Sequence, residues 1–179
     1  MNIEDRYRAL ISQLKLGKQP RLPFSLEEKK QLFAFWQSWI DNSERCEQEL
    51  QPLLCLLSHS KDYYPELLNF FITSFQIIEG DETTVFLLGA SQLHIIQGAI
   101  QAGERFPYEY IMALKPLLIA KAPQVNEWAL RAVADLGPQS ILLKDAILEL
   151  RPGAMRVFSG QQKTIHQLIG HIQDSWPKV

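Results

Sequence analysis

The chain has 179 residues, enough for one compact domain or one short solenoid with a sizeable core. Hydrophobic residues make up 46% and charged residues 21%, which excludes a disordered chain, and every apolar run falls short of the ~20 residues that span a bilayer. The net charge of −2 provides no overall attraction to nucleic acid or anionic lipid, so we expect neither nucleic acid nor a membrane as a partner.

The start of the chain and its two cysteines indicate a compartment. The first residues are polar and acidic, without the basic start and apolar core of a secretory signal. Cys46 and Cys55 lie on one predicted helix, at a separation that places them about 180° apart around its axis and argues against a shared disulfide or metal. We therefore expect free thiols and a cytoplasmic protein.

Helical periodicity and stop signals divide the chain into helices, and no stretch shows strand alternation. The predicted helices cover 3–15, 25–42, 44–58, 64–79, 83–102, 107–121, 125–137, 138–150 and the segment after 160. Ser25 and Glu28 form a capping-box pattern, Pro52 is expected to bend its helix near the middle, and Pro65 suits a first turn. Residues 151–160, with two glycines, are expected to form the one long loop.

Apolar positions recur at a constant shift of 40 residues. The aligned pairs are Val85 and Val125, Leu88 and Trp128, Gly89 and Ala129, Leu93 and Val133, and Ile96 and Leu136, and the next shift reaches Ile165, Leu168, Ile169 and Ile172. Such a period is the signature of a helical repeat array. We predict an all-α fold, a right-handed α-α superhelix (solenoid) of about nine helices in four pairs. It would form a single domain over 1–179, with 1–24 as a capping helix and linker and 25–179 as repeats.

One segment of the chain carries a family pattern. In 111–118 a proline is followed by two leucines, and a short turn leads to a second helix that begins at Val125 and closes on Leu136-Gly137. This pattern resembles a HEAT repeat, of the armadillo-type class of helical repeats. The similarity is best over 107–137, fair over 65–103 and weaker towards both ends. It implies a scaffold whose second helices line an inner, partner-binding surface.

A polar row on the second helix of this best repeat is the candidate binding site. Glu127, Arg131 and Asp135 are spaced i, i+4, i+8 beside Trp128. They form either an exposed ion-pair ladder or a recognition stripe, because Trp and Arg are favoured binding anchors. The 40-residue shift adds a neighbouring row, Leu87, Ser91 and Ile95 with His94 near it, and on the other side Gln167, His171 and Ser175. Burial of Leu87 and Ile95 under the adjacent repeat is the alternative.

The sequence holds no motif for catalysis, and we expect no metal and no cofactor. His166 and His171 are the only histidines that share a predicted helix, and their i, i+5 spacing is poor for a joint metal site. The aromatic residues of the N-terminal half are expected to form core, with a ligand cleft at Trp36 or Trp39 as the alternative.

We therefore expect a non-catalytic protein–protein interaction module, monomeric or a weak homodimer. Two alternatives remain open. One is an enzyme like the DNA glycosylases of HEAT-like fold that act on alkylated bases. Those enzymes combine a basic groove with aromatic residues and an Asp, and Trp128, Arg131 and Asp135 resemble that combination weakly. The other is a small inhibitor or immunity-type protein.

Overall fold

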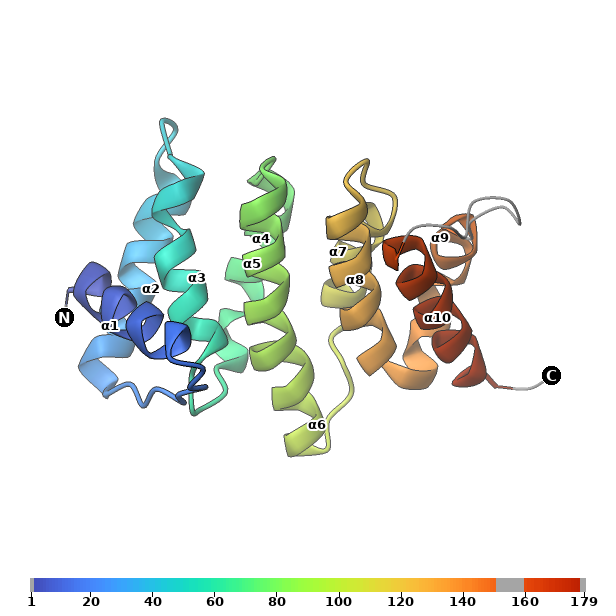
Figure 1. Ribbon diagram of the computed structural model, residues 1–179, viewed down its shortest axis with the longest axis horizontal. Coiled ribbons are helices and arrows are strands. Elements are labelled where there is room, and N and C mark those ends of the chain that lie inside the picture. Colours follow the sequence, from blue (N-terminus) through green and yellow to red (C-terminus); the bar gives the residue numbers. More distant parts are fainter. Residues whose placement is uncertain (1, 151–159, 178–179) are drawn as a thin grey trace. The chain divides into compact units, whose positions relative to one another are not determined.

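The computed structural model describes residues 2–150 and 160–177, and the regular elements in this part of the chain are all helices, with no strand (Figure 1). A single isolated parallel bridge joins Leu22 to Ser60. The all-α prediction is therefore confirmed. The predicted 151–160 loop lies outside the described residues except for Gly160, which begins the last helix. Contacts divide the chain into two compact units, Met1–Gly98 and Ala99–Val179.

The first unit contains α1 (Ile3–Lys15), α2 (Leu26–Asp41), η1 (Glu47–Glu49), α3 (Gln51–Ser58), η2 (Pro65–Leu67), α4 (Leu68–Ile77) and α5 (Asp81–Ser91). The helix that begins as α5 continues through a π-helical turn, Gln92–Gln97, into α6 (Gly98–Ala102). Within this unit α1 and α5 both pack on α3, while α4 packs on α2 and on α5. Trp36 of α2 is fully buried, and its indole N–H donates to the hydroxyl of Ser74 in α4 over 2.9 Å.

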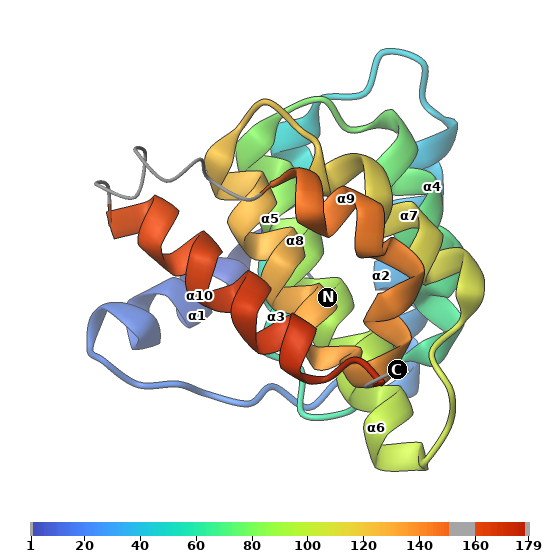
Figure 2. The same ribbon diagram turned by 90° about the vertical axis from the view of Figure 1, so that its right-hand side faces the viewer.

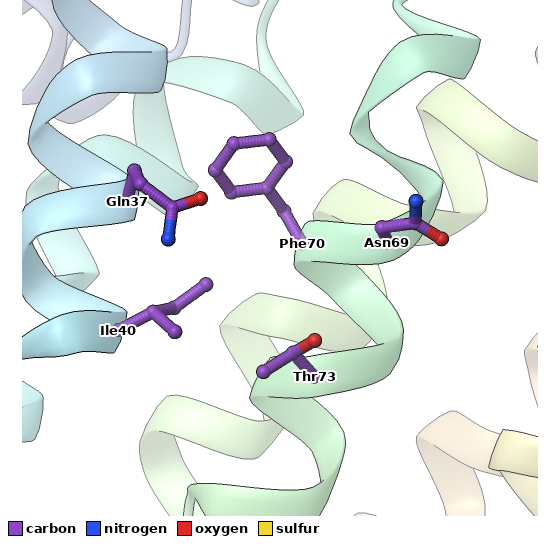
Figure 3. Close-up of a pocket in the computed structure, with 5 residues that line it drawn as sticks. All are labelled: Gln37, Ile40, Asn69, Phe70 and Thr73. Atoms are coloured by element: carbon purple, nitrogen blue, oxygen red, sulfur yellow. The ribbon is translucent and has the colours of Figure 1, made fainter.

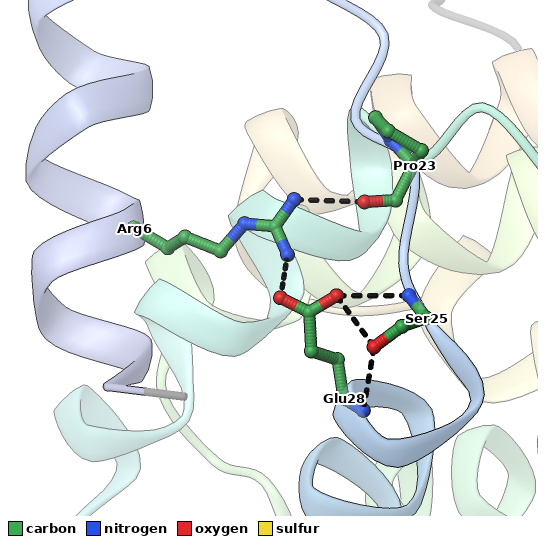
Figure 4. Close-up of polar contacts among 4 residues, drawn as sticks. All are labelled: Arg6, Pro23, Ser25 and Glu28. Atoms are coloured by element: carbon green, nitrogen blue, oxygen red, sulfur yellow. Dashed lines mark hydrogen bonds and ion pairs between the residues drawn. The ribbon is translucent and has the colours of Figure 1, made fainter.

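The capping box predicted at the start of α2 is confirmed, and α1 is tied to it (Figure 4). The Glu28 carboxylate accepts from the Ser25 backbone N–H over 2.8 Å, and the Ser25 hydroxyl accepts from the Glu28 N–H. Arg6 of α1 pairs with the other oxygen of Glu28 and donates to the Pro23 carbonyl over 2.7 Å. The Ser25 N–H, and after it Arg6, lowers the pKa of Glu28. The network explains how a short first helix is held against the rest of the unit.

Two predictions in this region were wrong. The helix predicted over 44–58 begins only at Gln51, and Pro52 lies in its first turn, where a missing backbone N–H costs nothing, instead of bending its middle. Cys46 consequently lies before η1, outside α3, so the two cysteines do not share a helix. Both are free thiols, Cys46 exposed and Cys55 buried, and burial raises the pKa of Cys55.

A carboxylate from η1 holds the turn between α4 and α5. Glu47 accepts the backbone N–H groups of Glu79 and Gly80 over 2.8 and 2.9 Å. A Cβ atom on Gly80 would overlap the Glu47 carboxylate, so any side chain there displaces the carboxylate.

We expect Gly80→Ala to lower the free energy of unfolding by about 1–2 kcal/mol, because the charged hydrogen bonds are lost. Urea unfolding measures this change. Gly170→Ala is the matched control, since Gly170 lies in a helix with nothing within 4 Å of an added Cβ, and there alanine should stabilise slightly. In a Glu47→Ala background, Gly80→Ala should lower the free energy of unfolding no further. An equally large loss of unfolding free energy in that background would contradict the role of the Glu47 carboxylate.

The second unit contains α7 (Tyr108–Leu118), α8 (Pro123–Asp135), η4 (Gly137–Leu143), α9 (Lys144–Glu149) and α10 (Gly160–Asp174). α7 and α10 both pack on α8, and Figure 2 shows α10 lying along α8. The helix predicted over 138–150 starts as a 3₁₀ helix and becomes α-helical only at Lys144. Trp176 ties the end of the described chain to it by donating to the Ser140 hydroxyl over 2.9 Å.

One helix meets the length and composition test for a membrane span, the continuous helix Asp81–Ala102 of 22 residues. The expectation that no stretch reaches this length was therefore wrong. Half of its most apolar window is buried inside the protein, and core helices of water-soluble proteins pass the same test. The residues that make it apolar include Leu87, Leu88 and Ile96, which are fully or almost fully buried.

Candidate functional site

The helix α8 carries the predicted binding row and is buried over most of its circumference. The apolar positions that recur with helical periodicity along this segment are buried: Val125, Ala129, Ala132, Val133 and Leu136, together with Asn126 and Leu130. Gly137 follows in the left-handed conformation that commonly ends a helix, with φ of 54°. What remains open to solvent is a narrow strip that contains Glu127, Trp128, Arg131 and Asp135.

Asn126 explains how α8 is held against α7. Its side-chain N–H₂ group donates to the carbonyls of Leu117, Leu118 and Ala120, each over 3.0 Å. These carbonyls lie at the end of α7 and just beyond it, where the i+4 backbone donor of a helix is missing. An uncharged amide therefore satisfies the carbonyls at the end of α7.

Within the exposed strip, three side chains of α8 contact one another. The Arg131 guanidinium donates twice to one Glu127 oxygen, from Nε over 3.3 Å and from Nη2 over 2.7 Å. Its Cζ lies 6.0 Å from the centre of the Trp128 ring. The side chains of Arg131 and Glu127 are 45% and 20% exposed, so the pair contributes at most about 0.5 kcal/mol to stability. Asp135 lies on the same strip and is half-buried.

The neighbouring row predicted from the 40-residue shift is not on the surface. Leu87, Ser91 and His94 have no exposed surface, and Ile95 has almost none. Their expected exposure was wrong, and the alternative of burial holds for Leu87 and Ile95. The shift identifies equivalent positions on the helices, but it does not say how much of each helix its neighbours cover.

His94 is instead part of the core of the first unit. Its Nδ1 accepts from the Tyr64 backbone N–H over 3.1 Å, and its Nε2 donates to the Leu57 carbonyl over 3.1 Å. The imidazole stacks on the Tyr64 ring at 4.9 Å and lies 6.3 Å from the Phe71 ring. Burial lowers the pKa of His94 to about 4, against the raising effect of the Leu57 carbonyl. The ring therefore joins α3, η2, α4 and the π-helical turn as a neutral group.

A hollow that the sequence did not predict lies between α2 and α4 (Figure 3). It is lined by Gln37, Ile40, Asn69, Phe70 and Thr73 and has a volume of about 100 Å³. A second hollow of about 100 Å³ lies beside Trp39. Both are small against the roughly 300–1,000 Å³ of pockets for drug-sized ligands. Of the two tryptophans expected at a cleft, Trp36 lies in the core and Trp39 borders the second hollow while being 4% exposed.

The described ranges, 2–150 and 160–177, contain no group of three or more His, Cys, Asp or Glu side chains placed to hold a metal ion. No known protein family, curated protein or solved structure matches this chain. The class that the observations define is therefore a structural one, an all-helical protein of two compact units with one polar–aromatic strip exposed on α8.

Proposed function

We propose that the chain is a HEAT-like α-solenoid of four helix pairs that binds a protein partner, without catalysis, through the strip on α8. The 40-residue register supports the repeat assignment, as do the contacts inside each unit. In the first unit the second helices α3 and α5 pack together, and so do the first helices α2 and α4. In the second unit α8 packs on α10, and α7 packs on α9. Cytoplasmic residence and a monomeric or weakly dimeric state belong to the same proposal.

The observation that carries the binding proposal is Arg131 held over the half-exposed ring of Trp128. Tryptophan and arginine dominate the energetics of protein interfaces, because a flat ring and a planar guanidinium bury a large area at a small entropic cost. Glu127 already pairs with Arg131 in the free protein, so part of the ordering of this side chain precedes binding. The same pairing offsets the charge of Arg131, which favours a protein partner over the phosphates of nucleic acid.

A photo-crosslinking residue at position 131 tests the surface directly. In lysate from the native source we expect a discrete protein adduct from position 131 and none from position 115, where the exposed Lys115 of α7 provides the matched control. With the captured partner purified, Trp128→Ala and Arg131→Glu should each weaken binding about 30-fold or more.

Two outcomes would contradict the proposal. One is equal labelling at positions 131 and 115. The other is unchanged affinity of the Trp128→Ala protein while its circular dichroism and thermal midpoint match the parent. Duplex DNA serves as the counter-probe, since binding that weakens steeply with salt would favour the glycosylase-like alternative.

A further inference from the structure

The charge of the first unit is unevenly distributed, although the chain as a whole has a net charge of −2. Between Asp5 and Glu27 the sequence contains five cations and no acidic residue: Arg6, Arg8, Lys15, Lys18 and Arg21. Glu28 engages Arg6. The others are exposed to solvent. A cationic segment of this kind creates a local positive potential that the global charge conceals.

The structure gathers part of this segment along one edge of the first unit. The connector from the end of α1 to the start of α2 runs along this edge (Figure 1). It is held there by the Leu22–Ser60 bridge, in which the Leu22 backbone N–H donates to the His59 carbonyl over 2.7 Å and the Lys61 backbone N–H donates to the Leu22 carbonyl over 2.8 Å. The bridge brings the exposed Lys61 beside Arg21, which adds a cation from a distant part of the sequence. We call Lys15, Lys18, Arg21 and Lys61 the basic edge.

Acidic groups near the basic edge are few. Asp62 follows Lys61, and Glu27 and Glu66 are exposed on the flanking helices. Lys29 lies 4.4 Å from the centre of the Tyr64 ring and adds a half-exposed cation. The edge therefore retains an excess of positive charge.

Two leucines project from the ends of the same connector. Leu16, which ends α1, is 73% exposed, and Leu26, which begins α2, is 71% exposed, the highest values among the large exposed hydrophobic side chains. Gly17 beside Leu16 has nothing within 4 Å of an added Cβ, so there is open space at this point of the chain. Both leucine side chains therefore present most of their surface to solvent.

We propose that the basic edge binds the surface of an anionic lipid bilayer, with Leu16 and Leu26 entering the interface. Cations that lie within a Debye length of anionic headgroups are attracted to them, and protruding apolar side chains gain by leaving water. Exposed leucines on both sides of these cations favour a bilayer over a soluble acidic peptide, because only the bilayer offers the leucines an apolar interior. The expectation of no membrane partner followed from the net charge of the whole chain. The proposal depends instead on how charge is distributed locally over the first unit.

Vesicle sedimentation with the full chain tests the proposal. We expect binding to phosphatidylcholine vesicles that contain about 30% phosphatidylserine, little binding to pure phosphatidylcholine, and a marked loss at high salt. Lys15→Glu combined with Lys18→Glu should weaken binding about 30-fold or more. In the part of the chain that the structure describes, neither lysine side chain makes a hydrogen bond that the substitution would remove. The matched control is Lys115→Glu combined with Lys121→Glu, which changes the net charge equally on exposed positions of the second unit.

Leu16→Ser separates a bilayer from a soluble polyanion. It should weaken binding to the anionic vesicles several-fold while leaving binding to poly-glutamate unchanged. The proposal is overturned if the wild-type chain ignores anionic vesicles, or if the control pair weakens binding as much as the pair in the basic edge. A third outcome would assign the basic edge to acidic protein segments instead. In that case poly-glutamate binds as tightly as the vesicles, and Leu16→Ser changes neither affinity.

Discussion

Asn126→Asp is expected to lower the free energy of unfolding by about 3–5 kcal/mol at neutral pH. The two side chains have nearly the same shape, but the amide donates to three carbonyl oxygens and a carboxylate cannot donate at all. The substitution places a buried negative charge against the carbonyls that end α7. Urea unfolding of the variant beside the parent measures the change.

Two further variants identify the cause of the loss. Asn126→Ala, which removes the donors without adding charge, should cost less, about 1–3 kcal/mol. Asn69→Asp, on an exposed position of α4, should stay within about 0.5 kcal/mol of the parent. The excess cost of Asn126→Asp over Asn126→Ala should shrink as the pH falls towards about 4, because a protonated carboxyl is neutral and can donate. An Asn126→Asp protein as stable as the parent would show that the amide does not hold α7 to α8.

The parent chain is expected to lose about 3 kcal/mol of stability through His94 as the pH falls from 6.5 to about 4. The unfolded chain takes up a proton on this imidazole below its ordinary pKa of 6.5, whereas the folded chain does so only near pH 4. Between these values the unfolded state binds more protons, so lowering the pH favours unfolding. Above 6.5 the imidazole is neutral in both states and its contribution to stability does not change with pH.

His94→Gln removes this pH dependence while keeping the polar contacts available. A glutamine amide can accept from the Tyr64 N–H and donate to the Leu57 carbonyl, but it does not titrate. Stability of the variant should therefore fall less steeply between pH 6.5 and 4, with carboxylates supplying whatever slope remains. His166→Gln, on an exposed position of α10, is the control and should retain the parent slope. Equal slopes for the parent and His94→Gln would contradict the assignment.

The local signals in the sequence predicted the helices well where packing does not override them. The capping box at Ser25, the left-handed Gly137 and the apolar face of α8 follow from hydrogen bonds and side-chain spacing within one helix or one turn, which the sequence contains in full. Pro52 shows the limit. A proline is compatible with the first turn of a helix and with a bend in the middle, and only the true start of α3 distinguishes the two.

The candidate site, too, could be predicted from the sequence only in part. Glu127 and Arg131 form their i, i+4 pair because one helix places them together, so spacing alone was enough to predict it. Ser91 and His94 lie at positions that the 40-residue shift relates to the surface of α8, yet they are buried. How much of a helix is covered depends on its neighbours, which no periodicity within that helix encodes.

By itself the sequence determined that the chain is helical, where most helices begin and end, and which face of α8 is apolar, because these follow from short-range hydrogen bonding and side-chain spacing. Tertiary structure alone decided that Asn126 holds α7 to α8, that His94 is neutral in the core, and that Lys61 joins the basic edge. Each of these depends on groups that are distant in sequence or belong to different elements, and only the folded chain brings them within hydrogen-bonding or electrostatic range.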